Sequence, residues 1–369
     1  YARGVLMSAD QRFVASKAVA RPGTPRNALG LLAAMTTAAL SIGCGAEFDP
    51  PSEINSLRVL AVQKDKPYPK PGDDVTVSML WYDGSDKAPR PVQIAWFSGC
   101  NNPPGDFYYG CYESLAQGLS AVGSGQAPPP GVGFGTGNQF TFSIPDDIIS
   151  SRPRSKDPDL IPYGLSYVFF AACAGELGPA PEGQGFPLAC FDASGEQVAS
   201  EGFVAGYTGA YVYDEFKNSN PVITGFEFNN LVVFPDCVGD ACLADPPPPS
   251  QVCGEGLACV DACEADGDPQ DCPEIKLRPL ISSDVAETDD VAAAAEGRNV
   301  TEQMWINYYA EKGDFKSAVR LLADAQKGFN TDYGTSFYAP KERGDIKLWA
   351  VAHDNRGGTE WVRITVRVQ

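Results

Sequence analysis

Cysteine is the residue type in this sequence with the broadest chemistry, and the chain contains 11 of them. Zinc sites use C-x2-C pairs, which bring two thiolates to one ion. The segment 237–272 holds six cysteines, yet it contains no such pair. We therefore predict disulfides there, with the connectivity left open because six cysteines allow many pairings. The cysteines of this segment are Cys237, Cys242, Cys253, Cys259, Cys263 and Cys272.

Four cysteines outside this segment also stand at spacings suited to disulfides. Cys100 and Cys111 can close one short loop, and Cys173 and Cys190 can close another. Ten cysteines in a turn-rich chain indicate folding in an oxidising compartment. Cys44 is left over from this count and needs a separate explanation.

Carboxylates gather at the end of the cysteine-rich segment, where Asp266, Asp268 and Asp271 lie close together in the sequence. Ca²⁺ binds six to eight oxygens, so these side chains are candidates for a calcium site. The EF-hand pattern is absent, because no glutamate follows at the twelfth position. The other interpretation, which we favour, is a solvated acidic loop beside a disulfide.

The single histidine, His353, is the one candidate for histidine-based catalysis. A histidine base needs a nucleophile and an orienting acid, but adjacent residues of a strand face opposite sides, so Asp354 need not serve His353. The chain has no G-x-S-x-G, H-E-x-x-H or Walker motif. We interpret His353 as structural. A glycosidase needs only two carboxylates that meet in space, which spacing cannot reveal.

Aromatic residues are numerous, with 19 Phe, 15 Tyr and 5 Trp. We expect most of them in the hydrophobic core. Phe107, Tyr108 and Tyr109 form a consecutive trio close to Cys111, outside the predicted strands. If the predicted disulfide at Cys111 holds this trio in place, its rings can form an exposed stacking surface for a sugar or a protein partner.

Composition further limits the classes of fold and function that the chain can have. The formal net charge is −19, which argues against nucleic-acid binding because phosphate contacts need clustered Lys and Arg. The 38 glycines and 31 prolines predict many turns and few long helices. A length of 369 residues is enough for two or three domains.

The N-terminal region has the pattern of an export signal. Residues 1–27 are mostly basic among their charges, residues 28–42 are apolar, and Gly43 and Cys44 follow. A basic stretch, an apolar stretch and a small residue are typical of a secretory signal peptide. The apolar stretch is shorter than the ~20 residues that a membrane-spanning helix needs.

Residues Leu40 to Cys44 (LSIGC) resemble the lipobox of bacterial lipoproteins. The resemblance implies that residues 1–43 are a signal peptide, that Cys44 carries the acyl chains, and that residues 44–53 form a tether. The protein would then be exported and held at a membrane only by its lipid anchor, at the outer membrane, the cell surface or facing the periplasm. Acylation of Cys44 would leave ten cysteines to form five disulfides.

Alternating apolar residues predict β-strands along most of the remaining chain. Val75, Val77 and Met79 lie on one face of one strand, and Val362 and Ile364 begin the apolar face of another. Helices are expected at 290–296 and 316–327, and an irregular loop at 118–137. The predicted strands are 57–62, 75–81, 92–96, 140–145, 165–174, 202–213, 222–228, 345–352 and 361–368.

Two short motifs resemble bacterial Ig-like and PKD-like domains. Asp354 and Gly357 match the D-x-x-G loop that joins the last two strands, and Pro71-Gly72-Asp73 matches the entry to the second strand. The resemblance implies a mainly β fold with little helix, made of two tandem Ig-like β-sandwich modules. We place these modules at 54–218 and 219–369, with the disulfide-rich insert 237–272 in the second.

These observations together predict a non-catalytic cell-envelope lipoprotein with a binding or structural role at the cell surface or in the periplasm. Its expected partners are an envelope protein or a glycan, with no cofactor and no nucleic acid. The alternative is a secreted or anchored hydrolase that acts on glycans through Asp and Glu residues. The sequence does not indicate the oligomeric state.

Overall fold

A computed structural model describes residues 51–124, 126–129, 131–153, 161–181, 186–243, 252–254, 257–265 and 269–369. The predicted signal peptide, Cys44, Asp266 and Asp268 lie outside these residues. Among the described residues, no helix has the length and apolar character needed to cross a membrane.

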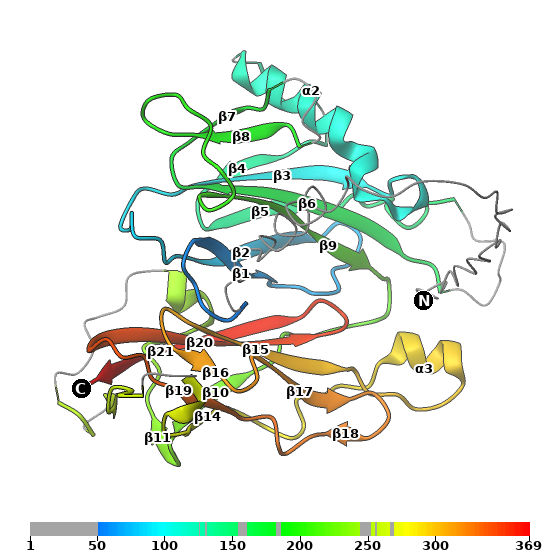
Figure 1. The fold of residues 1–369 in the computed structure, drawn as a ribbon. Coiled ribbons are helices and arrows are strands. Elements are labelled where there is room, and N and C mark those ends of the chain that lie inside the picture. Colours follow the sequence, from blue (N-terminus) through cyan, green and yellow to red (C-terminus); the bar gives the residue numbers. More distant parts are fainter. Residues whose placement is uncertain are drawn as a thin grey trace, which may run out of the picture. The chain divides into compact units, whose positions relative to one another are not determined.

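The first half of the described chain forms a β-sandwich of two antiparallel sheets (Figure 1). One sheet has the order β1-β2-β5 and the other the order β4-β3-β6-β9. Their facing apolar residues include Val77, Trp96 and Val168, all at most 1% exposed. The strands are β1 (Leu57–Lys64), β2 (Asp74–Asp83), β3 (Gln93–Asn101), β4 (Phe134–Thr136), β5 (Gln139–Ser143), β6 (Gly164–Cys173) and β9 (Phe203–Val212).

The second half forms another sandwich, with sheets ordered β11-β10-β14-β19-β16 and β12-β21-β20-β15-β17-β18. Met304, Phe337 and Val362 lie fully buried between the two sheets. The strands of the first sheet are β10 (Ile223–Phe228), β11 (Leu231–Val233), β14 (Ile275–Ile281), β16 (Asp314–Phe315) and β19 (Thr335–Tyr338). Those of the second are β12 (Cys237–Val238), β15 (Met304–Ala310), β17 (Val319–Asp324), β18 (Gly328–Phe329), β20 (Gly344–Asp354) and β21 (Thr359–Val368).

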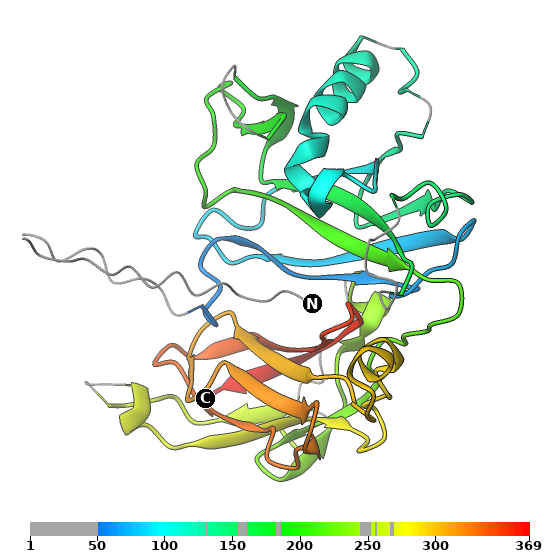
Figure 2. The ribbon, with the colours of Figure 1, turned by 90° about the vertical axis from the view of Figure 1, so that its right-hand side faces the viewer.

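The two sandwiches stack sheet against sheet, with β1 and β2 of the first facing β20 and β21 of the second (Figures 1 and 2). Leu60 and Leu80 of the first sandwich pack in one hydrophobic cluster with Trp349 and Trp361 of the second. Both tryptophans are at most 1% exposed. The second faces of β1 and β2 are therefore largely covered, whereas Gln139, Thr141 and Ser143 of β5 stay exposed, and Pro50–Gln369 form one structural unit.

The cysteine-rich insert adds strands to the second sandwich. β12 pairs antiparallel with β21, and β13 (Ala258–Val260) pairs parallel with the same strand. Two short 3₁₀ helices, η3 (Gly239–Leu243) and η4 (Pro269–Asp271), also lie in this segment. The insert is thus attached to the sheet by backbone hydrogen bonds as well as by its own disulfides.

A second set of insertions covers the outer face of the β4-β3-β6-β9 sheet. It consists of the 3₁₀ helices η1 (Pro104–Asp106) and η2 (Tyr108–Cys111), the helix α2 (Tyr112–Gly123), and the hairpin of β7 (Glu176–Pro179) and β8 (Leu188–Phe191). Leu115 and Leu119 of α2 pack against this sheet in a cluster with Phe97 and Phe169. These insertions lie on the side of the first sandwich that faces away from the second (Figure 2).

Every strand predicted from alternation is present, so the mainly β fold with little helix is confirmed. The helix predicted at 290–296 is also confirmed as α3 (Asp290–Glu296), which begins where the Asp289 carboxylate accepts a hydrogen bond from the Ala292 N–H at 3.0 Å. Gly297, at φ +67°, ends it in the left-handed region.

Two of the secondary-structure predictions are wrong. The segment 316–327 contains strand β17 instead of a helix, because pairing with β15 buries Leu322 and Ala323 and outweighs local helix propensity. The loop predicted at 118–137 begins with the last turns of α2 and includes β4. Two glycines conceal α2, although Leu115, Leu119 and Val122 have helical spacing.

Candidate functional site

All ten cysteines from Cys100 onward form disulfides. The first sandwich contains Cys100–Cys111 and Cys173–Cys190, the two pairs expected from the sequence. In the insert each cysteine pairs with its neighbour in sequence, which resolves the open connectivity. These pairs are Cys237–Cys242, Cys253–Cys259 and Cys263–Cys272.

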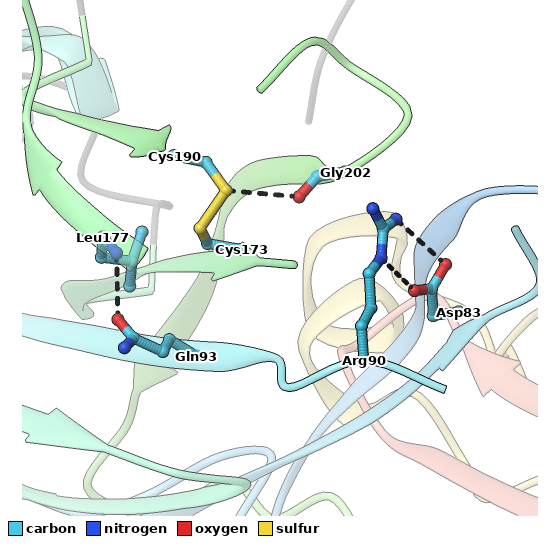
Figure 3. Close-up of a disulfide and its surroundings, with 7 residues drawn as sticks. All are labelled: Asp83, Arg90, Gln93, Cys173, Leu177, Cys190 and Gly202. Atoms are coloured by element: carbon cyan, nitrogen blue, oxygen red, sulfur yellow. Dashed lines mark hydrogen bonds and ion pairs between the residues drawn. A yellow bond between two sulfur atoms is a disulfide. The ribbon is translucent and has the colours of Figure 1, made fainter. Parts of the chain in front are cut away.

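The two disulfides of the first sandwich fasten its outer insertions to the sheet. Cys100 of β3 holds Cys111, the residue that precedes α2, and Cys173 of β6 holds Cys190 of β8 (Figure 3). Because β3 and β6 are buried strands, both insertions start from fixed points. Side chains on these insertions are therefore held in position relative to the sheet.

The predicted aromatic trio lies in η2 and the residue before it. Phe107 and Tyr109 are 53% and 55% exposed, and their rings stack with centroids 5.2 Å apart. Tyr108 turns inward and stacks on Tyr207 of β9 at 4.0 Å. The trio thus supplies two exposed rings and one supporting ring.

Strand β9 extends this surface. This extension was not predicted from the sequence, although the even spacing of the tyrosines in β9 could have indicated it. Tyr207 and Tyr211 are 45% and 42% exposed. Gly209 stands between them, and the ring of Tyr167 lies against it, so close that a Cβ there would be 3.3 Å from Tyr167 Cε1. We call Phe107, Tyr108, Tyr109, Tyr167, Tyr207 and Tyr211 the aromatic platform.

A polar network supports one end of the aromatic platform. The Asp106 carboxylate accepts hydrogen bonds from Arg152 and from the Tyr163 hydroxyl, each at 2.8 Å. The Arg152 guanidinium also lies 4.0 Å above the Tyr163 ring. The Tyr167 hydroxyl donates to the Asp106 carbonyl oxygen at 2.9 Å. These contacts connect η1, the loop after β5 and strand β6.

The network also sets protonation states. Burial acts to raise the pKa of Asp106, but the hydrogen bonds from Arg152 and Tyr163 lower it overall, so the group stays a carboxylate. Burial raises the pKa of Tyr163 and of Tyr167 to about 12. Both hydroxyls therefore remain protonated hydrogen-bond donors at neutral pH.

Two residues beneath the aromatic platform adopt left-handed backbone conformations, Asn102 at φ +46° and Asp106 at φ +60°. Such conformations need support from surrounding structure and occur often at functional sites. The Asn102 side chain supplies part of this support, since it accepts from the Leu165 N–H at 3.0 Å and donates to the Ile148 carbonyl at 2.6 Å.

His353 lies at the end of β20, away from the aromatic platform. Its ring stacks on Trp305 at 5.4 Å, and burial lowers its pKa to about 4, so it is neutral at physiological pH. The Asp354 carboxylate accepts instead from the backbone N–H groups of Arg356 and Gly358, at 2.7 and 2.8 Å. This pattern holds the D-x-x-G turn, and both residues act structurally.

The most strongly buried carboxylate network in the described structure surrounds Arg356. Its guanidinium contacts Glu302 at 2.6 Å and Glu287 at 2.9 Å. Burial raises the pKa of Glu302 to about 7, while Arg356 acts in the opposite direction. Glu302 is 1% exposed, so a sugar does not reach this carboxylate, whereas a glycosidase needs both of its carboxylates at the substrate.

The calcium prediction falls largely outside the described residues, because Asp266 and Asp268 are not among them. Asp271 is exposed in η4. Within the parts of the chain that the structure describes, no group of three or more His, Cys, Asp or Glu side chains is placed to hold a metal ion.

The fold and the site define a class: a mainly β, disulfide-stabilised protein of two stacked sandwiches with an exposed aromatic surface. No protein-family model and no curated protein matches the sequence. Solved structures with some likeness include fibronectin(III)-like modules of Clostridium thermocellum CbhA, at 9% identity and a TM-score of 0.19, covering 84% of this chain and 94% of that one.

Two further structures show comparable likeness. Escherichia coli alpha-2-macroglobulin matches at 10% identity and a TM-score of 0.19, over 88% of this chain and 23% of that chain. A bacterial ice-binding adhesin matches at 6% identity and a TM-score of 0.19, over 86% of this chain and 67% of that chain. The five disulfides are typical of proteins that fold outside the cytoplasm.

Proposed function

We propose that this protein is a non-catalytic cell-envelope lipoprotein that binds a glycan on its aromatic platform. The observation that carries the proposal is the set of four exposed rings, Phe107, Tyr109, Tyr207 and Tyr211, on a disulfide-held surface. Large exposed apolar groups that gather in one place mark interaction sites.

The chemistry of the aromatic platform suits a sugar. Flat ring faces can pack against the apolar faces of pyranose rings, and tyrosine hydroxyls add hydrogen bonds at the edges. Stacking between the rings and the disulfide Cys100–Cys111 fixes the surface before a ligand arrives. A preorganised surface loses little conformational entropy on binding.

Charge favours a neutral glycan. Asp106 and Arg152, the charged groups that the described residues place in the network at the aromatic platform, neutralise each other at 2.8 Å. The chain as a whole carries a net charge of −19, which repels an acidic polysaccharide. We therefore propose an uncharged polysaccharide or oligosaccharide as the ligand.

The membrane anchor is the second part of this proposal. The LSIGC motif that ends at Cys44 supports acylation, and the disulfides support export from the cytoplasm. Metabolic labelling with a fatty acid tests it: we expect label in the wild-type protein and none in Cys44→Ser. Equal labelling of both proteins would contradict the anchor and leave the glycan site unaffected.

Glycan binding is tested with immobilised neutral polysaccharides and the variants Tyr109→Ala and Tyr207→Ala. We expect each variant to bind roughly tenfold more weakly or worse, the effect typical of a hot-spot residue. Phe234→Ala is the matched control, because Phe234 is 83% exposed in the second sandwich. An equal loss in Phe234→Ala, or undiminished binding by both tyrosine variants, would contradict the proposal.

A further inference from the structure

A large apolar groove lies at the opposite edge of the same outer sheet, over β3 and β4 instead of β9. It runs between α2 and the β7–β8 hairpin and has a volume of about 1090 Å³. This is larger than the ~300–1,000 Å³ of most small-ligand sites. Ala95 contributes to its floor, Ala116 to one wall and Leu177 to the other.

Among the described residues that line this groove none is charged, although the protein carries a net charge of −19. Two of the polar side chains in its lining are engaged within the protein. The Gln93 side-chain oxygen accepts from the Leu177 N–H at 2.9 Å (Figure 3). The Ser124 hydroxyl donates to the Ser120 carbonyl at 3.0 Å. The groove is therefore complementary to an uncharged occupant that needs few hydrogen bonds.

A peptide fits this lining poorly, because each of its residues brings backbone donors and acceptors that need partners. The floor strand β3 has no free edge here, since β4 pairs with it from Ala95 to Phe97 and the Gly137 N–H donates to the Ile94 carbonyl at 3.1 Å. Pro179, Pro181 and Pro187 in the hairpin wall lack N–H groups altogether.

Both walls of the groove are fixed to the sheet. The disulfide Cys100–Cys111 holds the start of α2, and Cys173–Cys190 holds β8 (Figure 3). The hydrogen bond from Leu177 to Gln93 ties β7 to the floor strand as well. The groove is thus held open in advance of binding, which lowers the entropic cost of taking up a flexible chain.

We infer that this groove binds the acyl chain of a single-chain lipid, with the headgroup left in solvent. A hydrocarbon chain carries no charge and no hydrogen-bonding group, which matches the lining. This site is separate from the aromatic platform, so the inference does not depend on the glycan proposal.

The test is displacement of a fluorescent fatty acid from the full chain by lysophosphatidylcholines with octanoyl, decanoyl and dodecanoyl chains. Each buried methylene strengthens binding roughly fourfold, so each step of two methylenes should tighten it about 15-fold. Affinity that does not change with chain length, or the absence of any displacement, would overturn the inference.

Two variants on neighbouring positions of α2 locate the site. Ala116→Trp fills the groove and should weaken binding of the dodecanoyl lipid at least tenfold. Gln117→Trp is the matched control, because Gln117 is exposed on α2 and does not line the groove, and it should bind as the wild type does. Equal effects of the two substitutions would contradict the assignment, as would a loss in Tyr109→Ala on the aromatic platform.

Discussion

Aromatic residues gather in two regions of this molecule that differ in solvent exposure. Between the sandwiches, Trp349 and Trp361 are at most 1% exposed, because the sheet of one sandwich covers the sheet of the other. On the outer sheet, Phe107 and Tyr109 are more than half exposed. The contrast shows that a ring on a strand or turn becomes core or exposed surface according to what covers it.

The same contrast holds for charged groups. Between the sandwiches, Lys64 is 3% and Arg356 6% exposed, so both are almost completely removed from water. At the aromatic platform, Asp106 and Arg152 form a half-buried pair that keeps contact with solvent. Substitutions in the first region should change stability, and those in the second should change binding.

The largest expected effect is from Trp361→Ala between the sandwiches. The substitution removes a fully buried ring and the hydrogen bond that its Nε1–H donates to the Gly239 carbonyl at 2.7 Å. We expect the free energy of unfolding to fall by about 3–5 kcal/mol, measured by denaturant titration. A fall of less than 1 kcal/mol would show that the interface contributes little to stability.

Removal of the Cys100–Cys111 disulfide should have the next largest effect. It should lower both stability and glycan binding, and so reduce the difference between the two regions. Substitution of both cysteines by alanine frees a short loop and should cost about 2–3 kcal/mol in the free energy of unfolding. Glycan binding should weaken as well, because η2 loses its attachment to β3. The matched control, removal of Cys253–Cys259 in the insert, should leave glycan binding unchanged.

Lys64→Met should increase stability at neutral pH by roughly 1–3 kcal/mol, since it removes a buried charge. Burial lowers the pKa of Lys64 to about 8, with Asp354 acting in the opposite direction. An unfolded chain keeps this pKa near about 10.4. Between these values the unfolded state binds the extra proton, so wild-type stability rises with pH from about 8 toward 10.

Urea titrations of both proteins at several pH values measure this difference. The gap between Lys64→Met and the wild type should narrow as the pH rises through that range. A constant gap would show that Lys64 has the same pKa in the folded and the unfolded protein, and so carries no net cost of burial.

The smallest change in stability is expected from Tyr109→Ala on the aromatic platform. An exposed ring contributes little to folding, so the free energy of unfolding should change by less than about 0.5 kcal/mol. Loss of glycan affinity without loss of stability would sharpen the contrast between the regions. A loss of stability close to that of Trp361→Ala would show that the two regions do not differ in their contribution to folding.

Nine of the 21 strands in the described residues could be predicted from the sequence because alternation and burial on one face agree, as along Val366 and Val368. The two disulfides of the first sandwich could also be predicted, since each joins cysteines close in sequence, whereas the pairing of the six cysteines in the insert was left open. The helix α2 was missed because two glycines, one in its interior and one at its end, lower the helix propensity of its segment. Strand β17 was missed because its partner strand, not its own residues, decides its conformation.

The candidate sites were harder to predict. The trio Phe107–Tyr109 was visible as consecutive aromatic residues, but its continuation by Tyr207 depends on a contact across about 100 positions in the chain. The groove was not visible at all, because its floor and two walls come from segments separated in sequence. Stacking of the sandwiches was equally hidden, since an apolar second face on β1 suits a loop cover as well as a second sheet.

Burial of both faces of β1 and β2 has a consequence for how the chain unfolds. If either sandwich unfolded alone, the partner would be left with Leu60, Leu80 or the two tryptophans exposed to water. That penalty couples the two halves, so we expect one cooperative calorimetric transition instead of two. A fragment cut between the sandwiches would then be prone to aggregate, and functional work on this protein calls for both halves together.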